Sequence, residues 1–93
     1  MKHNILVKFK KEIDYNSLIP EIKNLFDGLK EIEGINDINI KTNCIKKENR
    51  YHLLIQIDMN KEVLPMYDES AVRKKWKQDY SEYIESKAIF DFE

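Results

Sequence analysis

Residues 51–58, Tyr-His-Leu-Leu-Ile-Gln-Ile-Asp, constrain the fold more strongly than any other segment of the chain. Alternation along a strand gives the segment two faces, one with Tyr51, Leu53, Ile55 and Ile57 and the other with His52, Leu54, Gln56 and Asp58. A strand predicted over residues 2–10 repeats the pattern, because Leu6 points away from Ile5 and Val7. Both strands carry apolar side chains on both faces, so their sheet needs cover on both sides.

A helix is predicted over residues 17–33. Its apolar positions recur every three or four residues and mark one face, made by Leu18, Ile22, Leu25, Leu29 and Ile32. Ser17 is the expected N-cap, which places Pro20 in the first turn, where its missing N–H costs little. Gly34 suits the left-handed position that follows the last turn.

The second half of the chain predicts a helix over residues 71–85 and a strand over residues 87–92. Ser70 is the expected N-cap of this helix, whose apolar face consists of Val72, Trp76, Tyr80, Tyr83 and Ile84. Residues 60–69 predict a broken or very short helix, because Pro65 does not fit inside a longer one. A strand over residues 36–42 and a polar loop up to residue 50 complete the pattern.

The order strand–helix–strand–strand–helix–strand indicates an α+β fold with a four-stranded antiparallel sheet. Both helices are expected on one face of this sheet, which leaves the other face bare. A second copy of the chain is the simplest cover for the bare face. We therefore expect a homodimer that forms through the face with Tyr51, Leu53, Ile55 and Ile57.

Composition limits the class of protein. The 93 residues suffice for one domain spanning residues 1–93, and 42% of them are hydrophobic. The single cysteine, Cys44, excludes an internal disulfide and suits a reducing compartment, so we expect the protein in the cytoplasm. No segment approaches the ~20 apolar residues that span a bilayer, and no membrane partner is expected.

The balance of charge gives no indication of a nucleic-acid partner. The net charge is −1, from 16 basic and 17 acidic residues. A basic cluster at Arg73, Lys74, Lys75 and Lys77 is typical of a solvated helix face that pairs with nearby carboxylates. A sheet that reads RNA also needs aromatic residues on its open face, and residues 51–58 offer only Tyr51.

The candidate functional residues are few. His3 and His52, the only two histidines, are expected on the helix side of the sheet, and the predicted ligand pocket comprises His3, Ile5, Val7, His52, Leu54, Tyr67 and Trp76. Tyr67, His52 and His3 are the candidate catalytic residues. The alternative is structural: Tyr67 and Trp76 are packed in the core, and the two histidines are ordinary surface and strand residues. Two histidines without a third ligand predict no metal site, and no cofactor is expected.

Four segments resemble one known family. Lys2-His3-Asn4-Ile5-Leu6-Val7-Lys8-Phe9-Lys10 resembles the opening strand of the stress-responsive A/B barrel (Dabb) proteins. Gly34-Ile35 is similar to the turn that follows their first helix, Leu64 to Tyr67 to their Leu-x-x-Tyr motif, and Ala88 to Glu93 to their terminal strand. The resemblance covers nearly the whole chain. It implies a ferredoxin-like fold that forms a dimeric α/β barrel.

The resemblance also bears on chemistry. It implies pocket positions for His3 and His52, and Tyr67 matches a tyrosine that acts on the substrate in cyclase-like plant relatives, which close a ring by aldol condensation. In those relatives two histidines follow the tyrosine at the third and sixth positions, where this chain has Ser70 and Arg73. A permanent cation replaces a group that titrates near neutrality, so the cyclase mechanism does not transfer directly.

Three functions remain open at this point. The chain binds a small apolar or aromatic molecule, or it is a cofactor-independent enzyme (polyketide-cyclase-like or a small monooxygenase) that uses Tyr67 with a histidine, or it is a purely structural module. A cavity in which Tyr67 and a histidine converge favours the enzyme. An open cavity without that convergence favours the binding protein, and a filled one favours the structural module.

Overall fold

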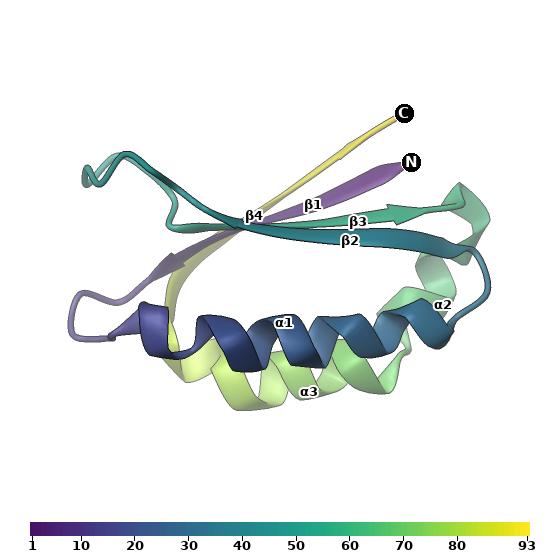
Figure 1. Ribbon diagram of the computed structural model, residues 1–93, viewed down its shortest axis with the longest axis horizontal. Coiled ribbons are helices and arrows are strands. Elements are labelled where there is room, and N and C mark those ends of the chain that lie inside the picture. The colour runs from purple at the N-terminus through teal and green to yellow at the C-terminus, as the bar shows by residue number, and fades with distance from the viewer.

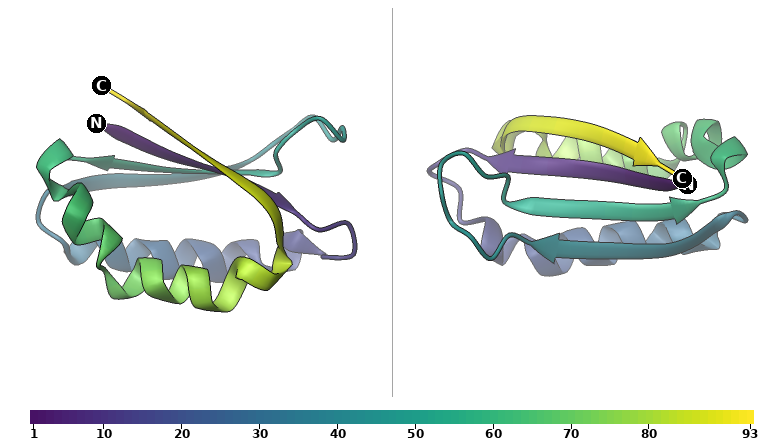
Figure 2. Two further views of the ribbon diagram at one scale, coloured as in Figure 1. Left: turned by 180° about the vertical axis from the view of Figure 1, so that it is seen from behind. Right: turned by 90° about the horizontal axis from the view of Figure 1, so that it is seen from above.

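Four strands form one antiparallel sheet in a computed structural model that describes residues 1–93. They are β1 (Lys2–Phe9), β2 (Ile35–Thr42), β3 (Leu53–Met59) and β4 (Ile84–Phe92), in the spatial order β2-β3-β1-β4. Figure 2 shows them side by side from above, with β1 and β3 in the centre. The predicted α+β, ferredoxin-like arrangement is confirmed.

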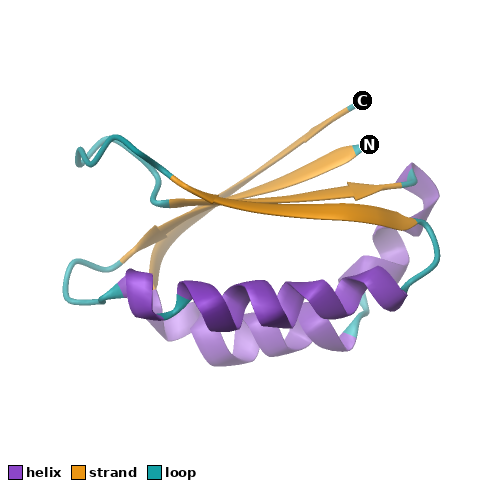
Figure 3. Cartoon of the chain, in the orientation of Figure 1, coloured by secondary structure: helices purple, strands orange, loops and turns teal.

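Three α-helices cover one face of the sheet and leave the other face bare (Figures 1 and 3). They are α1 (Ile19–Asp27), α2 (Leu64–Asp68) and α3 (Ala71–Tyr80). Short 3₁₀ turns flank them at Tyr15–Ser17, Gly28–Glu31, Lys61–Val63 and Ser81–Tyr83. No helix has the length and apolar character needed to cross a membrane.

The strand register decides which face of β3 is buried. Ile57 pairs with His3, Ile55 with Ile5 and Leu53 with Val7, and directly paired residues point to the same side of a sheet. Leu53, Ile55 and Ile57 therefore face the helices, and each is at most 1% exposed within a single chain. They pack in a core with residues of the helices, among them Ile22, Phe26, Leu29, Tyr67 and Trp76.

The predicted dimer face is consequently wrong. The helices of the same chain already cover Leu53, Ile55 and Ile57, because this face of β3 is the more apolar one and the helices need it. Tyr51 lies outside β3, where the chain bends, and lines a hollow with Leu6 and Leu54 on the bare face. Leu54 was predicted on the helix side, but it pairs with Leu6 and lies on the bare face.

The first helical segment is shorter than predicted. α1 ends at Asp27 and the chain continues as a 3₁₀ turn, so the apolar spacing persists although the α-helical hydrogen bonds do not. Ser17 is not the N-cap: its hydroxyl donates to the Asp14 carbonyl at 2.7 Å. Pro20 does lie in the first turn, and Gly34 has a φ of 96°. A Cβ at Gly34 would also lie 2.4 Å from Val63, so this turn requires glycine.

The second helical region is split as predicted. α2 begins at Leu64, so Pro65 lies in its first turn and removes no hydrogen bond. α3 begins at the predicted cap, with the Ser70 hydroxyl accepting from the Arg73 N–H at 3.2 Å. α3 ends at Tyr80, and β4 starts at Ile84 rather than at Lys87. The longer β4 runs along the whole of β1 and forms one edge of the sheet.

Candidate ligand-binding site

The structure brings together four of the seven predicted pocket residues: His3, Ile5, Tyr67 and Trp76. They line a cavity of about 270 Å³ between one end of β1 and β4 and the helices α2 and α3. The His3 and Tyr67 rings lie 5.2 Å apart between centroids. His3 is 6% exposed and Tyr67 is 2% exposed, so both are core residues of the chain that also reach the cavity.

The local structure explains why Tyr67 lies beneath β1. After β3 the chain turns back through the 3₁₀ turn Lys61–Val63 and the single turn of α2, which carries Tyr67 under the sheet. Trp76 is one helical segment further along, and its ring packs edge-on against Phe26 of α1 at 5.3 Å. These contacts fix one wall of the cavity, whose other apolar members are Ile5, Leu64 and Ile89.

Two polar atoms face this apolar wall. Nδ1 of His3 lies 2.5 Å from a carboxylate oxygen of Asp91, the residue paired with it across β1 and β4. Because an ionised carboxylate only accepts, Nδ1 of His3 carries a proton in this contact, and Nε2 makes none of the structure's hydrogen bonds. The Tyr67 hydroxyl makes none of the structure's hydrogen bonds, yet no fully enclosed side-chain polar atom lacks a partner. The hydroxyl therefore opens to the cavity.

Burial sets the ionisation of Tyr67. Removal of the ring from water raises the pKa of Tyr67 to about 12, against the opposing effect of the nearby Arg73 charge. The phenol is neutral at physiological pH and is available as a hydrogen-bond donor. The cavity thus offers a neutral phenol donor and the imidazole of His3 beside an apolar wall.

His52 lies elsewhere. It is six positions further along the sheet than His3, since Phe9 donates its backbone N–H to Nδ1 of His52 at 3.0 Å, and six residues of strand span roughly 20 Å. Its ring stacks on Tyr15 with centroids 4.6 Å apart, beside a separate hollow of about 570 Å³. Burial and then the Lys8 charge lower the pKa of His52. The prediction that both histidines line one cavity is wrong.

Two other predicted pocket residues also lie outside the cavity. Val7 is fully buried in the core, and Leu54 lies on the bare face of the sheet. The alternation predicted for residues 51–58 fails at its start, because β3 begins only at Leu53 and the chain bends at His52. This bend moves His52 away from the position that its sequence spacing indicates.

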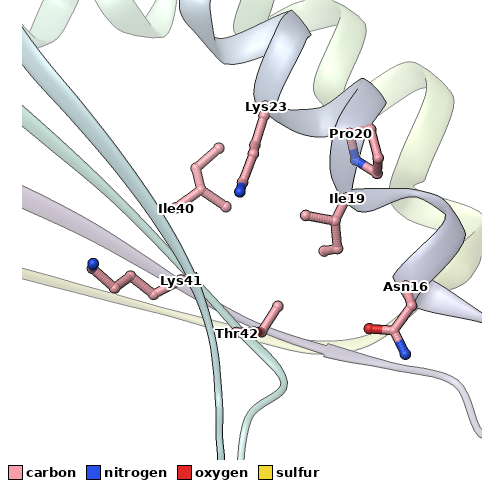
Figure 4. A pocket seen from close by; sticks show the side chains of 7 residues that line it. All are labelled: Asn16, Ile19, Pro20, Lys23, Ile40, Lys41 and Thr42. Atoms are coloured by element: carbon pink, nitrogen blue, oxygen red, sulfur yellow. The ribbon is translucent and has the colours of Figure 1, made fainter.

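A further hollow of about 530 Å³ lies between the first turn of α1 and β2 (Figure 4). Ile19 and Ile40 point toward each other across it, with Lys23 beside them. It contains no aromatic, histidine or acidic side chain, so it offers less chemistry than the Tyr67 cavity. No group of three or more His, Cys, Asp or Glu side chains is arranged to hold a metal ion, and Cys44 is exposed.

Sequence reasoning missed the charged rim of the cavity, which consists of Asp68, Arg73, Lys77, Lys87 and Asp91. A signal for part of it exists in β4. Lys87, Ile89 and Asp91 alternate along the strand and share one face, opposite to Ala88, Phe90 and Phe92. A strand face on which two charged residues flank one isoleucine is typical of the edge of a polar site, whereas a core-facing strand carries mainly apolar residues.

The fold defines the chain as a ferredoxin-like α+β protein. A dimeric ferredoxin-like protein of unknown function from Thermobifida fusca superimposes with a TM-score of 0.80 and 9% identity, over 98% of this chain and 87% of that one. An Arabidopsis thaliana protein known from its crystal structure gives a TM-score of 0.78 and 17% identity, over 99% and 92% of the two chains.

A Dabb family protein with a ferredoxin-like fold, from Mesorhizobium loti, gives a TM-score of 0.73 at 13% identity, over 99% of this chain and 93% of that one. The resemblance to Dabb proteins inferred from sequence is thus confirmed at the level of the fold. No family model matches the sequence. A comparison with curated proteins gave no match either.

Proposed function

We propose that this chain is a homodimeric, Dabb-like protein that binds a small apolar or aromatic molecule in the cavity between its sheet and its helices. One observation carries the proposal: Tyr67, a residue only 2% exposed, lines that cavity, and its hydroxyl has no short protein hydrogen bond beyond the nearby Arg73 guanidinium. Buried hydroxyls normally find a partner within the protein. A ligand that accepts from Tyr67 supplies the missing one.

The size and lining of the cavity support a one-ring ligand. Its volume of about 270 Å³ lies just below the range of ~300–1,000 Å³ for ligand sites, whereas a cavity of ~150 Å³ already holds benzene. Trp76, Ile5 and Ile89 supply the apolar contact. His3 and Tyr67 supply convergent polar groups that would fix the orientation of a bound ring.

The bare face of the sheet supports the homodimer. Leu6 and Leu54 lie at its centre, and Phe90 and Phe92 are 64% and 46% exposed at its β4 side. Beside them the Asn4 side chain accepts from Gln56 at 2.9 Å and donates to the Phe90 carbonyl, so this buried amide has partners within the chain. The Thermobifida fusca protein with this fold is dimeric. A second copy placed on this face would bury the phenylalanines.

The test is an NMR chemical-shift titration of the ¹⁵N-labelled chain with a panel of one-ring compounds that includes phenol, indole, benzamide and benzoate. Binding is expected to shift the amide signals of His3, Tyr67 and Ile89 in a saturable manner. His52→Asn, in the separate hollow, is the control and should leave the affinity unchanged. If no panel compound gives saturable shifts in these residues, the proposed site is wrong.

The His3–Asp91 pair favours one second candidate, a cofactor-independent enzyme. A carboxylate on Nδ1 orients the imidazole, and Nε2 is then placed to take a proton from substrate. Tyr67 would stabilise the developing oxyanion by donating its hydroxyl proton in a hydrogen bond. This arrangement suits proton abstraction next to a carbonyl, as in an intramolecular aldol closure.

A panel of phenolic and polyketide-like substrates tests this mechanism. Asp91→Asn should lower kcat at least ~100-fold, and equal turnover in Asp91→Asn and the wild type would exclude the mechanism.

A further inference from the structure

The charged residues around the cavity are not balanced. Asp68 pairs with Arg73, at 3.5 Å between its carboxylate and Nε, and the Asp91 carboxylate contacts His3. The three cations Arg73, Lys77 and Lys87 exceed the two carboxylates of the lining by one. No ion pair within 4.0 Å involves Lys77 or Lys87, although Lys74 and Lys75 of the same helix pair with Glu69 and Asp79. Two ammonium groups that belong to no ion pair therefore lie at the rim of the cavity, in a chain whose net charge is −1.

These two lysines come from elements far apart in the sequence. Lys77 lies on α3 one turn after Arg73, and Lys87 lies on β4 opposite the buried Val7, on the helix side of the sheet. The fold thus places three cations, Arg73, Lys77 and Lys87, beside one another. Partial burial, followed by the charges of Lys77 and Arg73, lowers the pKa of Lys87. The neighbouring positive charges therefore disfavour the protonated form of Lys87, and a bound anion would offset this repulsion.

The remaining lining limits which anion fits. A fully hydrated ion such as phosphate would make no apolar contact with the wall of Trp76, Ile5 and Ile89. A neutral ring would bring no negative charge to the two lysines. The neutral Tyr67 hydroxyl is a further donor for an anionic oxygen. An apolar ring that carries one carboxylate can pack against the wall, accept a hydrogen bond from the hydroxyl and form ion pairs with the two ammonium groups.

We propose that the ligand of this cavity is a small aromatic carboxylate, whose ring lies against Trp76 and whose carboxylate is held by Lys77 and Lys87. This proposal rests on the proposed function, because it specifies the ligand class of the same cavity. Lys77 and Lys87 are then specificity-determining residues. Screening by salt should weaken the interaction, since both ammonium groups are at the solvent-exposed mouth.

Benzoate and benzamide form a matched pair of probes, nearly equal in shape and different by one charge. In NMR titrations of the full chain at low salt, benzoate is expected to bind ~10-fold more tightly than benzamide. Lys87→Met and Lys77→Gln are each expected to lower benzoate affinity several-fold and to leave benzamide affinity unchanged. Lys74→Gln, on the same helix but outside the cavity, is the control and should change neither affinity.

The outcomes separate the two proposals. Equal binding of benzoate and benzamide, or a preference for benzoate that survives Lys77→Gln and Lys87→Met, overturns the anion preference and leaves the cavity as a ligand site. Binding of inorganic phosphate without binding of benzoate also overturns it. If neither aromatic probe binds, the proposed function falls and this inference falls with it. Thermal melts of the variants, which change only exposed side chains, verify that each remains folded.

Discussion

Tyr67 shows what burial does to a single side chain in this fold. Its pKa of about 12 results mainly from the loss of water around the ring, which outweighs the opposing effects of the Arg73 charge and of a hydrogen bond with Arg73. A group whose pKa is raised on folding stabilises the folded state fully below its unfolded pKa of ~10. That contribution is lost as the pH rises toward the folded pKa of about 12.

Replacement of Tyr67 by Phe should therefore act mainly at alkaline pH. Near pH 7 the variant should nearly keep the free energy of unfolding of the wild type, since only a weak contact with Arg73 is removed. Between pH 8 and pH 11 the wild type should lose ~1–1.5 kcal/mol more than Tyr67→Phe, as measured by urea unfolding. Tyr80, whose hydroxyl donates to Glu21 and whose pKa is also raised by burial, accounts for a further loss in both proteins.

Tyr51→Phe provides the comparison, because that ring is only half buried on the bare face of the sheet. It should follow the wild-type alkaline profile. A Tyr67→Phe profile that is indistinguishable from those of the wild type and Tyr51→Phe would show that burial does not perturb the phenol.

At the scale of single residues, the sequence predicted four of the eleven residues that line the candidate cavity. His3, Ile5, Tyr67 and Trp76 were correctly grouped, because strand parity and helix periodicity hold well inside regular elements. His52 was misplaced because β1 and β3 run antiparallel, which puts His52 beside Phe9 at the opposite end of β1 from His3. Asp91 and Lys87 could not be assigned to the cavity before the pairing of β4 with β1 was known.

Among the elements, α3 depends most visibly on a specific cap. The Ser70 hydroxyl accepts from the Arg73 N–H, and it also donates to the Tyr67 carbonyl at 2.7 Å, which links the end of α2 to the start of α3. Arg73 at the third position of the helix is thereby fixed beside the cavity. The cap therefore supports both the helix and one side of the candidate site.

Ser70→Ala should lower the free energy of unfolding by ~1–2 kcal/mol in chemical denaturation, because both hydrogen bonds of the hydroxyl are lost. Ser17→Ala is a matched control, since the Ser17 hydroxyl is exposed and caps no helix. The control should cost only a few tenths of that amount. Equal losses in the two variants would contradict the role assigned to the Ser70 cap.

Sequence patterns predicted the elements better than their orientation. All four strands and the split between α2 and α3 were expected, because periodicity and proline placement are local properties. The choice between the two apolar faces of β3 was wrong, because it depends on which face the helices cover. The end of α1 was also missed, since a 3₁₀ turn at Gly28–Glu31 preserves the same apolar spacing.

For the molecule as a whole, the bare face of the sheet sets the expected state of association in solution. The homodimer proposed here predicts sedimentation of the wild type as a dimer at micromolar concentration. Leu54→Lys, at the centre of the face, should convert it to a monomer, because burial of each such leucine contributes ~1.5–3 kcal/mol and a buried unpaired ammonium opposes association. The melting behaviour of the monomer core should change little, since Leu54 is outside it.

Met66→Lys serves as the comparison for this experiment. Met66 is 60% exposed, but it lies on α2 in the helical layer, away from the bare face. This variant should remain dimeric. A wild-type chain that stays monomeric at high micromolar concentration would refute the dimer, and a Leu54→Lys chain that stays dimeric would place the interface elsewhere.

Alternate residues of β4 belong to two different surfaces, the cavity and the bare face of the sheet. Lys87, Ile89 and Asp91 line the cavity, while Ala88, Phe90 and Phe92 belong to the bare face. A partner that restrains this edge strand from one side would also hold its cavity residues in place on the other. Association and ligand affinity would then be linked equilibria, each strengthening the other by the same factor. The apparent dissociation constant for a ligand should consequently decrease as the protein is concentrated.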